Sequence, residues 1–352
     1  MKALITVLDG DGIGPEVTAA AVAVLHHVAA IERFDLTIQH KLIGGAAIDA
    51  IGDPFPEDSE AACLASDAVL LGAVGGPKWD DPNAAIRPEQ GLLRLRKALR
   101  AYANLRPVKP IPSLLDSSPI KAELLRDVDL LVVRELTGGI YFGEKQRTAD
   151  YASDVCLYHR DEIERIVRFA ARLARGRSGR LCSVDKANIL ETSRFWREIT
   201  TSLMAREFPD IEVEHMLVDA AAMHLLRRPG HFDVIVTDNM FGDILTDEAS
   251  MLAGSMGLLP SASLGDGKPG LYEPIHGSAP DIAGRGIANP CAMIASVAMM
   301  FRHSFGLDAT ADRLQAALVK ALGSGVRTAD IAQSPQKAVD TRRMTDAIIA
   351  AY

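Results

Sequence analysis

Cysteine is scarce in this sequence. Only four of its 352 residues are cysteine, namely Cys63, Cys156, Cys182 and Cys291, and no two of them form a Cys-x-x-Cys pair. Such spacing in a chain of this size argues against a disulfide framework and against a zinc site. We predict four buried, reduced thiols in a cytoplasmic protein.

Long hydrophobic runs and an excess of positive charge are also lacking. The longest apolar run, Cys291–Phe301, is far shorter than the roughly 20 residues of a membrane-spanning helix, and Met1–Leu4 does not begin a signal peptide. The net charge is −8, whereas nucleic-acid binding needs clustered Lys and Arg. We therefore expect neither a membrane nor a nucleic-acid partner, although an acidic chain can still hold a basic pocket for a substrate with several carboxylates.

The hydrophobic pattern predicts an α/β protein of about two domains. Continuous aliphatic runs predict buried parallel strands at Ala3–Leu8, Ala68–Val74, Leu130–Val133, Arg180–Val184 and Val234–Thr237. Amphipathic segments predict helices at Glu16–Ile31, Arg160–Leu173 and Ser193–Phe208. Tyr141–Tyr158, with β-prone residues broken by Lys145–Asp150, predicts a protruding hairpin. Ligands of open α/β sheets bind at the carboxyl ends of strands.

The glycine-rich segment Gly10–Glu16 suggests a dinucleotide-binding loop. Its spacing is Gly-x-Gly-x-Gly, however, and no acidic residue closes a clear βαβ unit about 20 residues further on. On spacing alone we favour a tight strand-to-helix turn that needs positive φ.

Two carboxylates, Asp243 and Asp247, are four residues apart and lie on one face of an expected helix. They either share a cation or, as acidic residues near a helix start, favour the helix dipole. Asp219, which follows the apolar run 215–218, is a candidate third ligand. Ligation by carboxylate oxygens alone suits Mg²⁺ or Mn²⁺.

Three arginines are candidates for binding an anion. Arg106 precedes a proline and so lies on extended chain, and Arg134 directly follows a buried strand, where a charge needs a partner. Arg96 alone is compatible with an ordinary surface helix charge. Guanidinium groups bind carboxylates bidentately.

Two further residues are candidates for proton transfer, and one loop is a candidate for close approach of its backbone to a ligand. Each of them also has a purely structural interpretation. Lys186 follows a short strand and is either a base or a surface lysine. Tyr141 is either a proton donor or a packed strand residue. The loop Glu273–Asp281 is rich in small residues and lets a backbone approach a phosphate, while its His276 is alternatively a satisfied structural histidine.

Taken together, these segments resemble the metal-dependent β-decarboxylating dehydrogenases, the family of the isocitrate and isopropylmalate enzymes. The resemblance runs from Leu4 to about Tyr352 and includes the specific motif Arg134–Gly143. It implies two open α/β domains that share a large mixed sheet and bind NAD without a Rossmann fold. The first domain would comprise residues 1–101 and 255–352 and bind NAD, and the second would comprise residues 102–254 and hold the metal and substrate residues.

The resemblance also assigns roles by position. The catalytic residues would be Lys186 and Tyr141, and the metal ligands Asp219, Asp243 and Asp247. Substrate would contact Arg96, Arg106, Arg134, Asp219, Leu92, Leu93 and Glu89. NAD would contact Gly76, Glu89, Glu273, His276, Gly277, Ser278, Ala279, Asp281 and Asn289. A homodimer is implied, with the arm near 141–158 clasping its mate and with Lys186 and Asp219 entering the other subunit's site.

Substrate choice in this family depends on the segment before the first arginine. Leu92 and Leu93 offer an apolar wall for an isopropyl group, which disfavours a third carboxylate. The expected reaction is oxidative decarboxylation of 3-isopropylmalate to 4-methyl-2-oxopentanoate, CO₂ and NADH, in leucine biosynthesis. Asp281 favours NAD, because a carboxylate repels a 2′-phosphate. D-Malate, tartrate or homoisocitrate are alternative substrates, and a catalytically silent regulatory subunit is the alternative from another class.

Overall fold

The computed structural model describes residues 2–79, 81, 84–267 and 269–352. The chain forms two compact units. The first contains Met1–Ala101, Ile111–Ser117 and Gly254–Tyr352, and the second contains Tyr102–Pro110 and Ser118–Ala253. Ten of the described strands form one mixed sheet. The predicted α/β class and large mixed sheet are thus confirmed, while the functions predicted for the two domains stay predictions.

In the first unit, the strand order is β2-β1-β3-β12-β11. All neighbours pair in parallel except β11 and β12, which are antiparallel. The strands are β1 (Lys2–Gly10), β2 (Asp35–Lys41), β3 (Ala68–Ala73), β11 (Pro260–Leu264) and β12 (Gly270–Pro274). The helices are α1 (Gly14–Glu32), α2 (Gly44–Ile51), α3 (Glu57–Ala65), α4 (Pro88–Ala98), α10 (Cys291–His303), α11 (Asp308–Gly323) and α12 (Thr341–Ala351).

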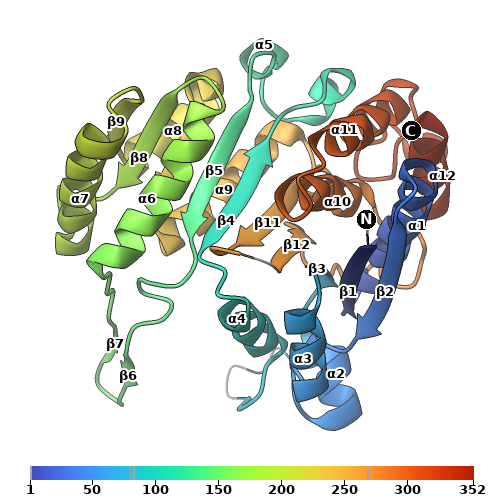
Figure 1. Cartoon of the computed structure of the whole chain (residues 1–352), viewed down its shortest axis with the longest axis horizontal. Coiled ribbons are helices and arrows are strands. Elements are labelled where there is room, and N and C mark those ends of the chain that lie inside the picture. Colours follow the sequence, from blue (N-terminus) through green and yellow to red (C-terminus); the bar gives the residue numbers. More distant parts are fainter. Residues whose placement is uncertain (1, 80, 82–83, 268) are drawn as a thin grey trace. The chain divides into compact units, whose positions relative to one another are not determined.

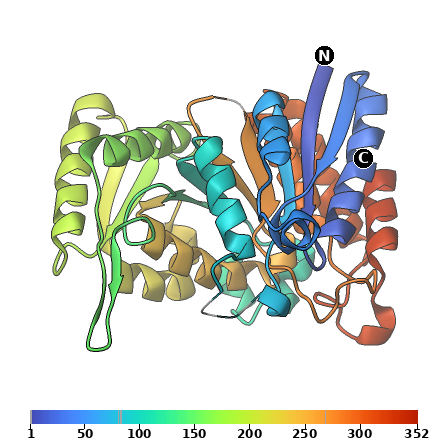
Figure 2. The ribbon, with the colours of Figure 1, turned by 90° about the horizontal axis from the view of Figure 1, so that it is seen from below.

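In the second unit, the strand order is β4-β5-β10-β8-β9, and only β4 runs antiparallel to its neighbour β5. The strands are β4 (Ala103–Val108), β5 (Leu130–Glu135), β8 (Arg180–Asp185), β9 (Glu212–Leu217) and β10 (Val234–Thr237). The helices are α5 (Ala122–Leu125), α6 (Arg160–Arg175), α7 (Glu191–Glu207), α8 (Val218–Arg227) and α9 (Asn239–Ala253). Helices α6 and α7 cover one face of these strands, and α8 and α9 cover the other (Figure 2).

The predicted hairpin is confirmed. Strands β6 (Lys145–Arg147) and β7 (Ala152–Asp154) pair in antiparallel fashion, are fully exposed, and project from the second unit (Figures 1 and 2). We predicted that the charged segment 145–150 breaks the β-structure, but its first three residues form β6. Their side chains are solvated on both faces, so the strand needs no apolar alternation.

Two long apolar helices, α1 and α10, belong to the first unit's core. In α10 every residue of Cys291–Phe301 is buried, so this run is a core helix. Helix α1 is long and apolar enough to span a membrane by length and composition alone, and half of it is buried inside the protein. It packs against α10, α12 and β3, and a core helix meets the same criteria.

The cysteines are free thiols, and three of them are buried. Burial raises the pKa of Cys63 and of Cys182 to about 12, which keeps them protonated and inert. Cys156 is only half-buried, so the prediction of four buried thiols is wrong for this residue. It lies close to the exposed arm, where less protein surrounds it.

Candidate active site

In the second unit, the parallel strands β5, β8 and β10 end at the same edge of the sheet, and polar side chains gather there. Arg134 is the penultimate residue of β5, and its side chain is 6% exposed. Its guanidinium donates to Asn239 Oδ1 through Nε at 3.1 Å and Nη2 at 2.8 Å, and through Nη1 to Asp243. Arg134 therefore lies within the strand and does not follow it as predicted, and its charge is paired, as its burial requires.

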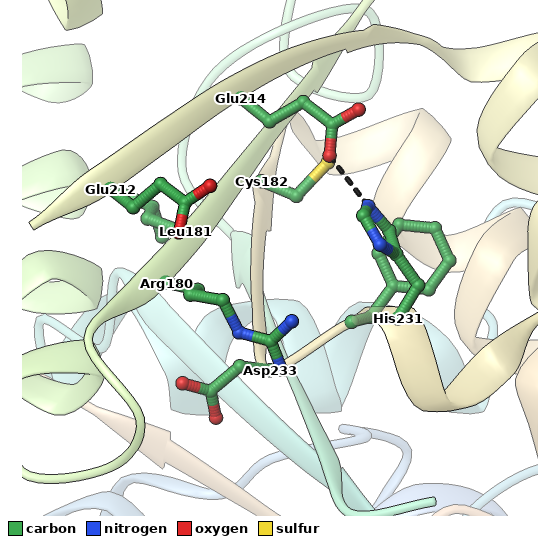
Figure 3. Close-up of a pocket in the computed structure, with 8 residues that line it drawn as sticks. Arg180, Leu181, Cys182, Glu212, Glu214, His231 and Asp233 are labelled. Carbon is green, nitrogen blue, oxygen red and sulfur yellow. Dashed lines mark hydrogen bonds and ion pairs between the residues drawn. The ribbon is translucent and has the colours of Figure 1, made fainter.

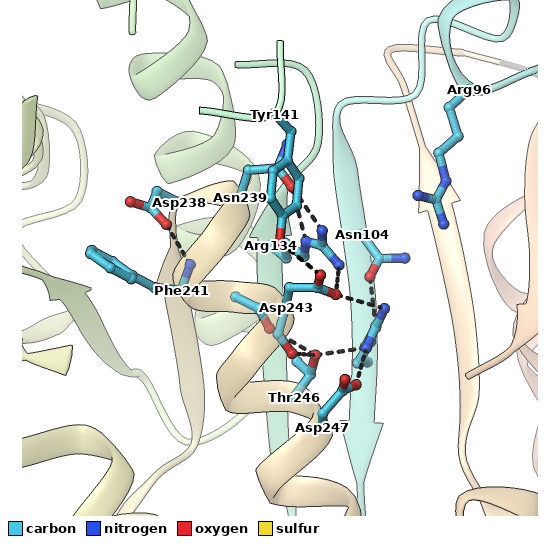
Figure 4. Close-up of polar contacts among 12 residues, drawn as sticks. Arg96, Asn104, Arg134, Tyr141, Asp238, Asn239, Phe241, Asp243, Thr246 and Asp247 are labelled. Carbon is cyan, nitrogen blue, oxygen red and sulfur yellow. Dashed lines mark hydrogen bonds and ion pairs between the residues drawn. The ribbon is translucent and has the colours of Figure 1, made fainter. Parts of the chain in front are cut away.

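Asp243 and Asp247 lie on α9, which begins at Asn239. Both carboxylates therefore lie beyond the first turn, and the helix-dipole alternative is wrong for this pair. Arg106 on β4 approaches them, with Nη1 at 3.3 Å from Asp247 Oδ1 and Nη2 at 3.9 Å from Asp243 Oδ1 (Figure 4). Two guanidinium groups thus offset the mutual repulsion of the two carboxylates.

Tyr141 belongs to a turn and to no strand, so the strand-packing alternative is wrong. Its hydroxyl donates to Asp243 Oδ2 at 3.0 Å, and its ring centroid is 5.8 Å from the Arg134 guanidinium carbon (Figure 4). Partial burial and the negative charge of Asp243 raise the pKa of the phenol. At neutral pH the hydroxyl therefore carries its proton and can act as an acid.

Lys186 and Asp219 form a separate pair. Lys186 follows β8, and its Nζ donates to Asp219 Oδ1 at 2.6 Å, which lowers the pKa of the Asp219 carboxyl. Asp219 is the second residue of α8, with its side chain 59% exposed. Among the described residues, no group of three His, Cys, Asp or Glu within the chain is arranged to hold a metal. One chain therefore does not bring Asp219 to Asp243 and Asp247.

The first unit holds Arg96 on α4. Its side chain is 17% exposed and its Nη2 donates to Glu273 Oε1 at 2.8 Å, so it is not an ordinary surface helix charge. Its Nε is buried and has no hydrogen-bond partner. One turn earlier, Leu92 packs against a buried cluster and Leu93 is 42% exposed. Helix α4 thus presents a guanidinium and an apolar side chain together.

The loop that follows β12 contains most of the predicted cofactor residues. His276 Nδ1 hydrogen-bonds with Gly277 O at 2.9 Å, whereas its Nε2 is buried without a partner, so the ring is not the fully satisfied structural histidine of the alternative. Burial lowers the pKa of His276, which favours the neutral ring. A Cβ at Gly277 would meet no atom within 4 Å. An unpaired ring nitrogen beside open backbone fits a nucleotide ligand.

The remaining predicted cofactor residues have varied surroundings. Ser278 is buried, Asp281 is exposed, and Ala279 has a positive φ of 39°. Both polar atoms of the Asn289 side chain are hydrogen-bonded, because its Nδ2 donates to Asp330 at 3.0 Å and its Oδ1 accepts from Cys291 N.

Gly76 and Glu89 border the loop after β3. A Cβ on Gly76 would lie 3.3 Å from the Trp79 ring, and a Cβ on Gly75 would lie 2.8 Å from Glu89 Oε1. The Glu89 carboxylate therefore approaches this loop closely because residue 75 is a glycine.

A cavity of about 110 Å³ lies at the amino ends of β8 and β9. His231 Nε2 pairs with Glu214 at its wall, 2.7 Å apart, and Arg180 and Asp233 also line it (Figure 3). None of the predicted site residues is among those that line it. Because Arg180 begins β8 and Lys186 follows its end, the cavity is at the opposite end of the strand from the candidate site.

Three residues of the site were not identified from the sequence. Asn239 binds Arg134, Thr246 accepts from Arg106 Nη1 at 2.7 Å, and Asn104 accepts from Arg106 Nε at 3.0 Å. Thr246 lies between Asp243 and Asp247 in the sequence, and this position could have identified it as a residue of the site. Nothing in the local sequence marks Asn104, because its role depends on the pairing of β4 with β5.

The fold is α/β, and arginines, aspartates and a tyrosine gather at the carboxyl edge of the second unit's strands. The family model described as isocitrate/isopropylmalate dehydrogenase matches residues 4–348. The chain belongs to this family, and the resemblance inferred from the motifs is confirmed.

Relatives and solved structures are similar along the whole chain. The protein called 3-isopropylmalate dehydrogenase in Geobacillus kaustophilus is 57% identical over 349 residues, covering 98% of this chain and 94% of the relative. The one of the same name in Rhodopirellula baltica is 55% identical and covers 99% of both. The crystal structure of isocitrate dehydrogenase from Methylococcus capsulatus has a TM-score of 0.88 at 35% identity, covering 99% of both chains.

Proposed function

We propose that this protein catalyses the NAD-dependent oxidative decarboxylation of 3-isopropylmalate to 4-methyl-2-oxopentanoate, CO₂ and NADH, a step of leucine biosynthesis. The observation that carries the proposal is the cluster around Asp243. Arg134 and Tyr141 both donate hydrogen bonds to Asp243, and Arg106 lies 3.3 Å from Asp247. Carboxylate-binding groups, oxygen ligands for a cation and an acid together match a 2-hydroxy dicarboxylate that loses CO₂.

Substrate binding requires that the arginines exchange partners. Arg106 and Arg134 bind the aspartates of α9, and Arg96 binds Glu273. The two carboxylates of the malate core replace part of these contacts, because a guanidinium binds carboxylates in bidentate geometry. Leu92 and Leu93 contact the isopropyl group, and these apolar side chains disfavour a third carboxylate.

Two proton transfers complete the chemistry. Lys186 removes the proton of the substrate hydroxyl as the hydride leaves the same carbon. The resulting β-keto acid loses CO₂, and its enolate is protonated at carbon by the Tyr141 hydroxyl. The raised pKa of Tyr141 keeps that proton available.

Two bound groups supply the remaining chemistry. NAD would supply the hydride acceptor, and a Mg²⁺ or Mn²⁺ ion would supply Lewis-acid stabilisation of the substrate oxygens. Asp219, Asp243 and Asp247 would hold the cation. We assign NAD to the first unit, through Gly76, Glu89, Glu273, Asn289 and the segment His276–Asp281. His276 Nε2, buried without a partner, supports that assignment.

We infer a homodimer with shared active sites. Asp219, Met223 and Leu226 lie on one face of α8, where Met223 is 62% and Leu226 is 41% exposed. On α9, Ile244 and Met251, which are 58% and 39% exposed, share a face with Asp247. Exposed apolar helix faces of this kind mark protein interfaces.

These faces of α8 and α9 also carry the proposed metal ligands Asp219 and Asp247. If α8 and α9 pack on their counterparts in a second copy, Asp219 of one chain approaches Asp247 of the other, as a two-fold interface allows. The projecting arm 141–158, with exposed Tyr151 and Leu157, would clasp the mate. We place this enzyme in the cytoplasm, where free thiols persist.

A substrate panel tests the function. Isopropylmalate, D-malate, tartrate, isocitrate and homoisocitrate should be assayed with NAD and Mg²⁺ or Mn²⁺ by NADH absorbance. We expect the highest kcat/KM for isopropylmalate and no turnover after chelation of the metal. A preference for another acid would overturn the substrate, and inactivity on every acid would favour the regulatory-subunit alternative.

A further inference from the structure

The glycine-rich segment Gly10–Gly14 binds other loops of the first unit and is not arranged to bind a phosphate. Its backbone N–H groups are largely engaged: Asp11 N donates to Ala73 O at 2.8 Å, and Ile13 N donates to Ser278 O at 2.8 Å. Gly10 and Gly12 have φ of 70° and 59°. The space beside Gly12 is filled, since a Cβ there would lie 2.0 Å from Ser278 O.

Asp11 holds the loop after β3. Its side chain is buried, with 5% exposure. Oδ2 accepts hydrogen bonds from Gly45 N at 2.8 Å and Gly75 N at 2.7 Å, and Oδ1 accepts from Ala46 N at 2.7 Å. A buried carboxylate with three backbone donors makes strong, charge-assisted bonds, so it ties Gly75, in the loop after β3, to Gly45 and Ala46 at the start of α2.

The same segment also holds the loop after β12. Besides the bond from Ile13 N to Ser278 O, Glu16 Oε1 accepts from Gly284 N at 2.6 Å. Asp11 and Glu16, five residues apart, therefore anchor the two loops to which we assign NAD.

We propose that Asp11 is a positioning residue for NAD binding, which acts by fixing the Gly75–Gly76 loop while Ile13 and Glu16 fix the 278–284 loop. The inference rests on the proposed function, because NAD is assigned to these loops there. Asp11 does not touch the cofactor. Its loss loosens the loop and raises the entropic cost of ordering it around NAD.

Asp11→Asn is the direct test. The amide has nearly the shape of the carboxylate, but its nitrogen cannot accept the backbone N–H bonds that Oδ1 or Oδ2 accepts. We expect KM for NAD, and Kd for NADH from fluorescence titration, to rise about tenfold. We expect kcat at saturating NAD and KM for isopropylmalate to stay within about twofold, since those residues keep their contacts.

Asp67→Asn is the matched control. Asp67 Oδ2 accepts a hydrogen bond from Leu4 N at 3.0 Å, at the other end of β1. It should lower Tm without changing the affinity for NADH. If Asp11→Asn lowers Tm as much as Asp67→Asn and leaves NADH binding equally unchanged, Asp11 is only structural and the proposal is wrong.

If Asp11→Asn does not fold, Glu16→Ala tests whether this segment positions the loops for NAD binding. Removal of the acceptor for Gly284 N should weaken NADH binding about threefold without changing KM for isopropylmalate. Unchanged NADH binding in Glu16→Ala would then overturn the proposal. A wild-type protein that binds no NAD or NADH would instead contradict the proposed function.

Discussion

Lys186 Nζ and Asp219 Oδ1 lie 2.6 Å apart within one chain, at the amino end of α8. The proposed reaction uses Lys186 as a base and Asp219 as a metal ligand. Within the described part of the chain, Asp219 does not join Asp243 and Asp247 in a group of three carboxylates that could hold a metal. In the homodimer that we propose, a second chain supplies this ligand and the base.

Subunit mixing tests the shared site. Lys186→Ala and Asp243→Asn proteins should each be inactive. After joint unfolding and refolding, about half of the dimers should be mixed, and in each of these one site collects both defects and the other none. About a quarter of all sites should then be active in the NADH assay, by the same pairing statistics.

Each parent refolded alone serves as the control and should stay inactive. If mixed dimers are shown to form, for example with a charge tag, and activity does not return, Lys186 acts within its own chain. The shared-site proposal would then be wrong, while the proposed reaction could still hold.

Asp243→Asn removes one anionic ligand and one acceptor for Arg134 and Tyr141. We expect turnover to fall by about 10²-fold or more, with partial recovery at high Mn²⁺. The measurement is kcat across a titration of metal concentration. Glu248→Gln, on the same helix, is the control and should titrate as wild type; equal turnover of Asp243→Asn at low metal would exclude Asp243 from the site.

Cofactor choice should depend on the exposed Asp281 and its neighbour Ile282. Asp281→Lys combined with Ile282→Tyr should shift the ratio of kcat/KM from NAD toward NADP by about tenfold or more, because repulsion of the 2′-phosphate becomes attraction. The KM for isopropylmalate should not change. Equal use of both cofactors by the native protein would contradict the role of Asp281.

Asp238 should make stability depend on pH. The pKa of its carboxyl is raised from 3.8 to about 7, mainly by burial and also by the negative charges of the nearby Glu135 and Asp185. The Phe241 N–H that it accepts and the charge of Arg134 oppose this shift. Between about pH 4 and 7 the folded state retains a proton that the unfolded chain releases, so this contribution to stability is lost as pH rises.

Asp238→Asn should remove that loss, because the neutral amide resembles the protonated acid and still accepts from Phe241 N. We expect its Tm to exceed that of wild type more at pH 8 than at pH 5. Asp161→Asn, at an exposed position of α6, should show no such difference. A Tm difference that is the same at both pH values would show that Asp238 is not the group responsible.

The sequence by itself determined several buried strands and helices and the identity of the chemical groups. Local patterns are enough for this, because a buried parallel strand needs a continuous apolar run and a tight turn needs glycine at positive φ. Strand β10 (Val234–Thr237) therefore has the predicted bounds, and Gly10 and Gly12 have the expected positive φ. Arg106 lies on an extended strand, as its proline neighbour indicated.

Only the tertiary structure decided which groups meet. Arg96 and Glu273 are 177 residues apart in the chain and form one ion pair, and Arg134 and Asn239 are 105 residues apart. No local preference encodes such pairs, because they result from the order in which strands assemble into the sheet. The same packing placed Asp243 in the second turn of α9 and Tyr141 in a turn, and it separated Asp219 from both within one chain. The chain thus encodes each functional group locally, and its long-range packing decides how those groups combine.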